Sequence, residues 1–163
     1  MIQEVSGDIL YTSAQVIAHG VAPNDHFNVG LALSLREYWP KMYQDFRHYC
    51  HVRSPKPGGV WVWAGSNGKI IASLLTRDAP MGIHGSPGKA TLQNINHALK
   101  ELRKVAQSQK YTSIALPRLA CGMGGLMWED VYPLITKHLE DLGIPVFVYT
   151  NYSKRVRAVE KFK

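Results

Sequence analysis

The sequence contains few cysteines and no long apolar run. Cys50 and Cys121 are its only cysteines and form no Cys-x-x-Cys pair, so neither a disulfide framework nor a structural zinc site is expected. No apolar run reaches the length of a membrane span, and residues 1–5 lack a basic region followed by an apolar stretch. Those would be the signs of a membrane helix and of a signal peptide. We therefore expect a reduced, cytoplasmic protein with no membrane partner.

The composition is that of a globular protein with surplus positive charge. The 163 residues are 45% hydrophobic and 19% charged, and the net charge is +7, which fits one ordinary domain. Residues 153–163 hold five bases and a single acid, Glu160. Such a basic tail can bind nucleic acid or an acidic partner, or it can be a solvated, frayed terminus. Nucleic-acid contact through it would be weak, because no motif that reads nucleic acid accompanies it.

Strand and helix patterns alternate along the chain without an internal repeat or a linker. Strands are expected at 2–5, 15–19, 60–64, 69–75, 111–116 and 145–149, and helices at 31–38, 41–51, 89–109 and 128–142. The sequence Gly-Ser-Asn-Gly at 65–68 predicts a hairpin. Apolar positions in 89–109 follow the three-four spacing of an amphipathic helix. The alternation predicts a single α/β domain with a mixed sheet and helices on both faces.

The most specific feature is a glycine-rich turn between an expected strand and an expected helix. Residues 116–129 read Leu-Pro-Arg-Leu-Ala-Cys-Gly-Met-Gly-Gly-Leu-Met-Trp-Glu. Glycines let the backbone approach a phosphate closely, and the free N–H groups of a first helical turn point at it. Ligands of such sheets bind at the carboxyl ends of the strands, where this loop and loop 20–30 both fall. The sequence therefore predicts an anion site.

Several short motifs, taken together in their order and spacing, resemble those of the macrodomain family. They are residues 5–10, 16–19, 27–32, 117–122 and 128–129. The resemblance implies a three-layer α/β/α sandwich with a central mixed sheet over residues 1–152, followed by a basic tail at 153–163. Members of this family bind ADP-ribose and often hydrolyse bonds to it. The most similar subgroup holds the terminal ADP-ribose–protein hydrolase, DNA ADP-ribosyl hydrolases and a fungal ADP-ribose 1''-phosphate phosphatase, which share a histidine at position 19.

The resemblance also implies which residues hold the adenine. Asp8 would accept a hydrogen bond from the adenine amino group, and Ile9 would offer its backbone N–H; the alternative for Asp8 is a helix cap or an Asx turn. Tyr149, Asn151 and Tyr152 follow the last strand, where the family often places an aromatic side chain against adenine. Tyr152 is the residue that we expect to stack, with packing on the fold as the alternative.

Two loops are expected to hold the rest of ADP-ribose. Loop 20–30 would wrap the distal ribose, and Asn28 and Gly30 stand where the family usually has Gly-x-Gly. Because asparagine tolerates left-handed backbone angles, this loop is expected to keep its shape. The resemblance implies that the second loop holds the diphosphate through Cys121, Gly122, Met123, Gly124, Gly125 and Leu126.

Three residues are candidates for catalysis. His19 matches the residue implicated in the fungal phosphatase, and an imidazole that titrates near neutrality can move a proton; the alternative is a hydrogen bond to a backbone carbonyl. Arg77 stands where the protein and DNA hydrolases have a lysine. Its guanidinium stays protonated, so it cannot replace a lysine nucleophile but can clamp a phosphate. His84 would serve as a second acid/base or phosphate donor, or else be a solvated loop residue.

The resemblance favours a hydrolase that removes the phosphate from ADP-ribose 1''-phosphate. The alternatives are a hydrolase that releases ADP-ribose from protein or nucleic acid, and a non-catalytic reader of ADP-ribose. Gly124 occupies the position of an aspartate that the terminal protein hydrolase uses, which argues against that mechanism. None of these reactions requires a cofactor, and we expect none. The cluster at 48–51 contains histidine and cysteine, but on one helix it is expected to be structural or exposed, with no metal.

Overall fold

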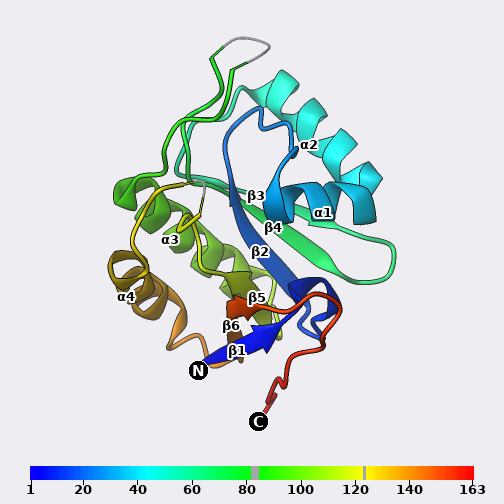
Figure 1. The fold of residues 1–163 in the computed structure, drawn as a ribbon, viewed down its shortest axis with the longest axis vertical. Coiled ribbons are helices and arrows are strands. Elements are labelled where there is room, and N and C mark those ends of the chain that lie inside the picture. The colour runs from blue at the N-terminus through cyan, green and yellow to red at the C-terminus, as the bar shows by residue number, and fades with distance from the viewer. Residues whose placement is uncertain (82–84, 123) are drawn as a thin grey trace.

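The structure is a computed structural model that describes residues 1–81, 85–122 and 124–163. Within these residues the chain forms six strands and four α-helices (Figure 1). The strands are β1 (Ile2–Gly7), β2 (Val16–Val21), β3 (Val60–Ala64), β4 (Ile70–Leu75), β5 (Ile114–Pro117) and β6 (Val146–Tyr152). The α-helices are α1 (Gly30–Tyr38), α2 (Pro40–Arg53), α3 (Leu92–Ser108) and α4 (Trp128–Leu139), and a 3-10 helix, η1 (Ile9–Tyr11), follows β1.

The strands form one mixed sheet in the order β1-β6-β5-β2-β4-β3. Its neighbours pair in parallel except β3 and β4, which are antiparallel. That antiparallel pair is the hairpin predicted at residues 65–68. Because the other strands run in parallel, β2, β4, β5 and β6 end at the same edge of the sheet. Their carboxyl ends are therefore brought together, as a ligand site in this class of fold requires.

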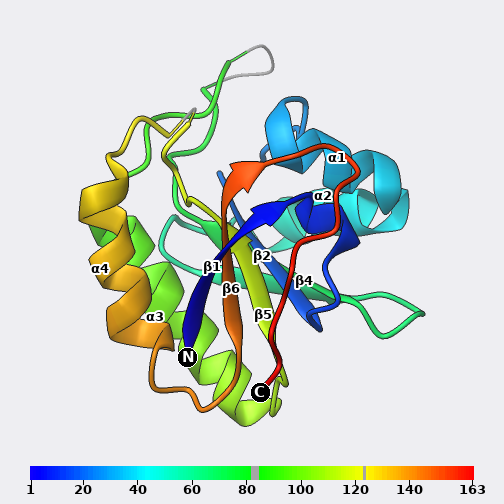
Figure 2. The ribbon, with the colours of Figure 1, turned by 60° about the horizontal axis from the view of Figure 1, so that its bottom comes forward.

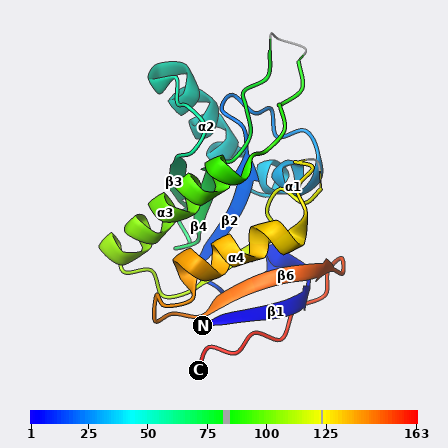
Figure 3. The ribbon, with the colours of Figure 1, turned by 90° about the vertical axis from the view of Figure 1, so that its left-hand side faces the viewer.

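Helices cover both faces of the sheet, so the predicted three-layer sandwich is confirmed (Figure 3). Side chains on a strand alternate between the two faces. Ile17 accordingly belongs to the buried cluster that contains Phe46 of α2. Its neighbour Val16 belongs to the other cluster, with Leu99 of α3 and Ile135 of α4. No helix among the described residues has the length and apolarity needed to cross a membrane.

Some element boundaries differ from those expected. The helix expected from residue 89 begins at Leu92, because Ala90 forms a β-bridge with Arg77 and Thr91 caps the helix by accepting a hydrogen bond from the Asn94 N–H at 3.1 Å. The strand expected at 111–116 begins only at 114. The last strand continues three residues beyond 149, because it pairs with β1 up to Tyr152.

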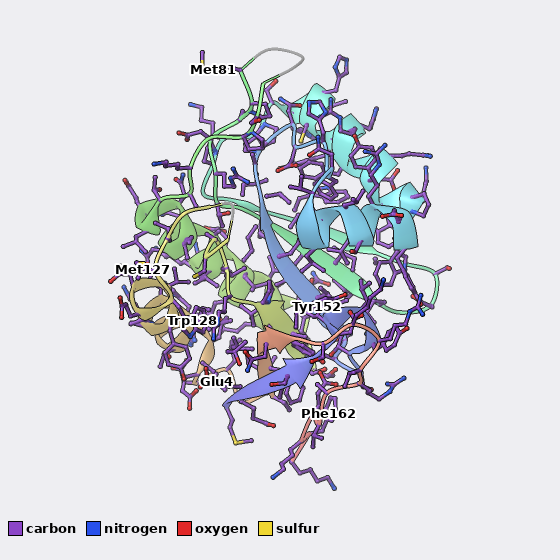
Figure 4. The ribbon with its side chains drawn as sticks, viewed as in Figure 1. Glu4, Met81, Met127, Trp128, Tyr152 and Phe162 are labelled. Carbon is purple, nitrogen blue, oxygen red and sulfur yellow. The ribbon has the colours of Figure 1, made fainter. Side chains whose placement is uncertain are left out.

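Residues 153–163, hereafter the C-terminal segment, return alongside β1 and end near the N-terminus (Figure 2). Ala158 is buried against Gly7, where an added Cβ would lie 2.8 Å from the Ala158 nitrogen. The ring of Phe162, which is labelled in Figure 4, packs on that of Phe147 with centroids 5.1 Å apart. The segment is therefore not frayed, because Ala158 is buried and Phe162 packs on Phe147, although Val156 and Val159 remain solvated.

Candidate functional site

Two adjoining cavities lie at the carboxyl ends of the parallel strands. The first, here called the Asp8 chamber, has a volume of about 410 Å³ and is lined by Gly7, Asp8, Ile9, Leu10, Gly30, Leu31, Ser34, Pro117, Tyr149 and Tyr152. The second, the His19 chamber, has a volume of about 360 Å³, and its lining includes His19, Asn28, Thr76, Arg77, Arg118, Gly122 and Gly124. Gly30, Leu31 and Pro117 line both chambers. Together the chambers can hold one elongated ligand.

Asp8 caps η1 and also lines its chamber. Its Oδ1 accepts a hydrogen bond from the Leu10 N–H at 3.1 Å, and its Oδ2 accepts one from the Arg155 N–H at 2.9 Å. The cap that the sequence left open as an alternative is therefore present. A carboxylate has about four lone-pair sites, so the two bonds leave Asp8 able to accept from a ligand as well. Ile9 lies beside it in the same wall.

The three residues expected after the last strand are placed differently from one another. Tyr149 is buried and donates its hydroxyl to Glu160 Oε2 at 2.7 Å, and burial raises its pKa, which keeps the hydroxyl protonated. Tyr152 is 71% exposed and still lines the Asp8 chamber (Figure 4). Asn151 is outside the lining of both chambers and donates to the Ser6 hydroxyl at 3.3 Å.

His19 lies near the end of β2 and is only 2% exposed. Its Nε2 is 2.7 Å from the hydroxyl oxygen of Ser73, its register partner on β4. Burial lowers the pKa of His19 to about 3, so the ring is neutral at physiological pH, and its role in moving a proton stays a prediction. Among the described residues, neither Nδ1 of His19 nor the hydroxyl of Thr76, which lines the same chamber, has a hydrogen-bond partner.

The first ligand loop takes its shape from residues other than Asn28. Asp25 accepts hydrogen bonds from the N–H groups of Ala22 and Phe27, at 3.0 and 2.9 Å. Phe27 (φ 51°) and Gly30 (φ 59°) have left-handed backbone angles, whereas Asn28 does not. The tolerance of asparagine for such angles is used at Asn24 (φ 58°) and not at Asn28. The exposed Asn28 contributes to the lining of the His19 chamber.

The glycine-rich loop contributes only part of its length to the cavity. Gly122 and Gly124 line the His19 chamber, and at Gly124 an added Cβ would lie 2.7 Å from the Ala120 oxygen. Three other predicted ligand residues are outside the lining of both chambers and instead close the turn or pack inward: Cys121, Gly125 and Leu126. Met123 lies outside the described residues.

Arg77 is a fixed cation at the rim of the His19 chamber. Its Nε donates to the Gly88 oxygen at 2.7 Å, and its Nη2 donates to the Pro87 oxygen at 3.1 Å. These bonds hold the guanidinium against a loop that itself lines the chamber. His84, the third predicted catalytic residue, lies outside the described residues.

Ser73, Thr76 and Arg118 also belong to this site, although the sequence patterns do not single them out. Ser73 is placed by the parallel pairing of β2 with β4, which strand patterns alone do not give. Thr76 directly follows β4, and the exposed Arg118 lies over the Trp128 ring at 5.7 Å. A polar residue at the carboxyl end of a predicted inner strand is the signal that could have found Thr76.

A macro domain family model matches residues 25–135. The chain belongs to the macrodomain family. The solved macrodomain of Thermus aquaticus DarG has the same fold, with a TM-score of 0.80 and 26% identity, over 92% of this chain and 98% of that one. No set of three His, Cys, Asp or Glu side chains in the described part of the macrodomain is placed to hold a metal ion.

Two curated relatives are similar to this macrodomain over most of its length. The ADP-ribose 1''-phosphate phosphatase of Candida albicans is 24% identical, over 91% of this chain and 99% of its own. The DNA ADP-ribosyl glycohydrolase of Thermus aquaticus is 27% identical, over 91% of this chain. The present chain spans only 41% of the length of that glycohydrolase.

Proposed function

We propose that this macrodomain binds ADP-ribose across both chambers and hydrolyses the phosphate ester of ADP-ribose 1''-phosphate. The observation that carries the proposal is the pair of buried polar groups without partners, His19 Nδ1 and the Thr76 hydroxyl, in a chamber that Arg77 also lines. A buried polar group without a hydrogen bond costs about 1–3 kcal/mol. Both atoms lie beneath the surface of the chamber, so an oxygen-rich ligand would supply the missing partners once the chamber wall shifts to expose them.

The Asp8 chamber fits the adenosine half of such a ligand. Its lining is largely apolar apart from Asp8, which can accept from the adenine amino group, and Tyr152 offers an exposed ring for stacking. Pro117 and Gly30 line both chambers and so form the junction between the Asp8 chamber and the His19 chamber. The diphosphate would pass this junction and reach the glycine-rich loop, where the backbone at Gly122 can approach it closely.

The distal phosphate would then lie beside His19 and Arg77. The dianionic ester adds negative charge next to the imidazole, which raises its pKa from the low value that burial gives. In the proposed reaction, neutral His19 takes a proton from water as the water oxygen adds to phosphorus. The bond between phosphorus and the ribose oxygen breaks, and His19 returns the proton to that oxygen, which yields ADP-ribose and inorganic phosphate.

Arg77 is suited to hold the phosphate throughout this reaction. Two of the five N–H donors of its guanidinium are used by the carbonyls of Gly88 and Pro87. The remaining donors can bind phosphate oxygens, and the charge persists at any working pH. The Candida albicans phosphatase, similar to this chain over nearly its whole length, supports the same substrate.

A second candidate is the release of ADP-ribose from a nucleobase. The similarity to the DNA ADP-ribosyl glycohydrolase and the exposed Arg118 in the lining of the His19 chamber favour it. Against it, Arg77 replaces the lysine of that subgroup and cannot act as a nucleophile. In this case Arg77→Ala should be the most damaging substitution, whereas a phosphatase should depend most on His19.

The test is to incubate the purified protein separately with ADP-ribose 1''-phosphate and with ADP-ribosylated single-stranded DNA. Phosphate release, release of free ADP-ribose and, by calorimetry, affinity for ADP-ribose are measured. Release of phosphate alone supports the phosphatase, and release of ADP-ribose from DNA supports the second candidate. Binding without turnover would indicate a reader, and the absence of binding would overturn the proposal.

A further inference from the structure

The C-terminal segment is hydrogen-bonded to the residue that carries the adenine end of the proposed site. The Ser153 N–H donates to the Gly7 oxygen at 3.1 Å, and the Asp8 N–H donates to the Val156 oxygen at 2.7 Å. The Arg155 N–H donates to Asp8 Oδ2 at 2.9 Å. The segment therefore holds both the backbone and the carboxylate of Asp8.

Glu160 ties the same segment to one wall of the Asp8 chamber and to the turn after η1. Its Oε2 accepts from the Tyr149 hydroxyl at 2.7 Å and from the Thr12 hydroxyl at 2.5 Å. Its Oε1 accepts from the Ser13 N–H at 2.9 Å. Tyr149 lines the chamber from β6, and Thr12 and Ser13 follow η1. One carboxylate thus connects Tyr149 of β6 to the turn that follows η1, the short helix that Asp8 caps at its other end.

Basic side chains complete this anchorage. Arg157 Nη1 donates to the Tyr11 oxygen at 3.1 Å and lies 3.4 Å from the Ser13 hydroxyl. From the β3–β4 hairpin, Lys69 Nζ donates to the Thr12 oxygen at 3.0 Å. The turn after η1 is therefore held from several sides. Arg157 of the segment is thus bonded to the fold, although its side chain stays exposed.

We propose that the C-terminal segment is part of the ligand site and that Glu160 is a positioning residue for Asp8 and Tyr149. This inference rests on the proposed binding of ADP-ribose. Glu160 does not contact Asp8; it acts through the segment, because its bonds to Thr12, Ser13 and Tyr149 hold in place the chain that carries Arg155. Leu10 N–H fixes only Oδ1 of Asp8, so displacement of Arg155 would leave the carboxylate free to rotate. A ligand would then have to order it on binding, which weakens affinity without changing the contacts made.

The test compares full-length wild type with Glu160→Gln and with Glu4→Gln, a matched change at an exposed glutamate on β1. Glu160→Gln removes the negative charge of the acceptor, so neutral hydrogen bonds replace the charge-assisted ones that Thr12, Ser13 and Tyr149 make to the carboxylate. We expect the ADP-ribose Kd to rise about fivefold, typical for loss of a net hydrogen bond, and KM to rise with kcat unchanged. Exchange of the Leu10 amide proton, followed by NMR without ligand, should become faster. Glu4→Gln should match wild type in every measurement.

The possible results separate this inference from the proposed function. If Glu160→Gln speeds Leu10 exchange but leaves Kd and KM unchanged, the segment is merely structural and the inference fails while the proposed function stands. Failure of wild type itself to bind ADP-ribose overturns both. If Glu160→Gln does not fold, Arg157→Gln, which removes only the bonds to Tyr11 and Ser13, takes its place. The same change in Kd and exchange is then required.

Discussion

The two chambers of the site differ in how their polar groups are satisfied. In the Asp8 chamber, the carboxylate of Asp8 and the hydroxyl of Tyr149 have partners within the protein, supplied by Leu10 and by the C-terminal segment. In the His19 chamber, His19 Nδ1 and the Thr76 hydroxyl are buried without partners. The polar groups named in the Asp8 chamber are thus satisfied within the protein, whereas the His19 chamber contains two buried polar groups that are not.

This difference indicates that one chamber contributes to binding and the other to turnover. Groups already fixed by the protein can contribute affinity equally in the ground state and the transition state, which lowers KM without changing kcat. Unpartnered groups beside the reacting atoms can gain their hydrogen bonds as the reaction proceeds. Substitutions in the Asp8 chamber should therefore act on binding, and substitutions in the His19 chamber should act on turnover.

The largest expected effect is that of His19→Ala. We expect turnover of ADP-ribose 1''-phosphate to fall by at least about 100-fold, since acid–base catalysis typically contributes that much or more. The Kd for ADP-ribose should stay within a few fold of wild type, because the other residues that line the two chambers keep their contacts. Phosphate release and calorimetry measure the two quantities. Unchanged turnover would rule out His19 as the catalytic residue and remove the contrast between the chambers.

A second large effect is expected on stability at acid pH. The pKa of His19 is about 3 in the folded protein against 6.5 for an unperturbed histidine, so the unfolded chain binds the proton more readily. The stability due to neutral His19 is complete above pH 6.5 and is lost as the pH falls toward 3. At pH 5 the loss relative to pH 7.5 should be about 2 kcal/mol.

Urea unfolding of wild type and His19→Asn at these two pH values measures that loss. Asparagine does not titrate and, like histidine, offers both a donor and an acceptor. The variant should therefore lose about 2 kcal/mol less than wild type between pH 7.5 and pH 5. Equal losses in the two proteins would show that His19 is charged or exposed in the folded state, contrary to its burial in the structure.

Much of the fold could be predicted from the sequence because its elements depend on local patterns. The hairpin at 65–68 and the amphipathic spacing of α3 are properties of short segments. The start of α3 was missed because Ala90 is held by a bridge to Arg77, a contact between distant segments. The docking of the C-terminal segment is not predicted for the same reason. Its composition, with five bases in eleven residues, indicates a solvated tail, and the places of Ala158 and Phe162 depend on contacts with distant residues.

The site was predicted less completely. The motifs located His19, Asp8 and the glycine-rich loop, and the structure brings these to adjoining chambers. They could not show that burial would neutralise His19, because its surroundings come from other strands and from Phe27. Gly122 lines the cavity whereas Leu126 packs inward. The sequence motif alone does not show which residues of the loop face the cavity, because that depends on how the loop folds back on itself.

In the Asp8 chamber, Asp8→Asn should weaken ADP-ribose binding about tenfold, since hydrogen bonds to charged groups are worth about 1.5–3 kcal/mol. The kcat should stay within about twofold of wild type, because adenine contacts do not change during the reaction. Asp141→Asn, at an aspartate on the far surface that pairs with Arg103, serves as the control. A fall in kcat comparable to the rise in Kd would show that the chambers are not separate in function.

The smallest expected effect is that of Tyr152→Ala, which tests whether adenine stacks on this residue of the Asp8 chamber. Because this side chain is 71% exposed, its removal in Tyr152→Ala should leave the melting temperature unchanged. Stacking on an aromatic ring contributes about 0.5–1.5 kcal/mol, so calorimetry should show an ADP-ribose Kd about threefold to fivefold higher. Tyr152→Phe keeps the ring and should bind as wild type does. If Tyr152→Ala binds ADP-ribose as tightly as wild type, adenine does not stack on this residue, and the affinity of the Asp8 chamber comes from its buried wall alone.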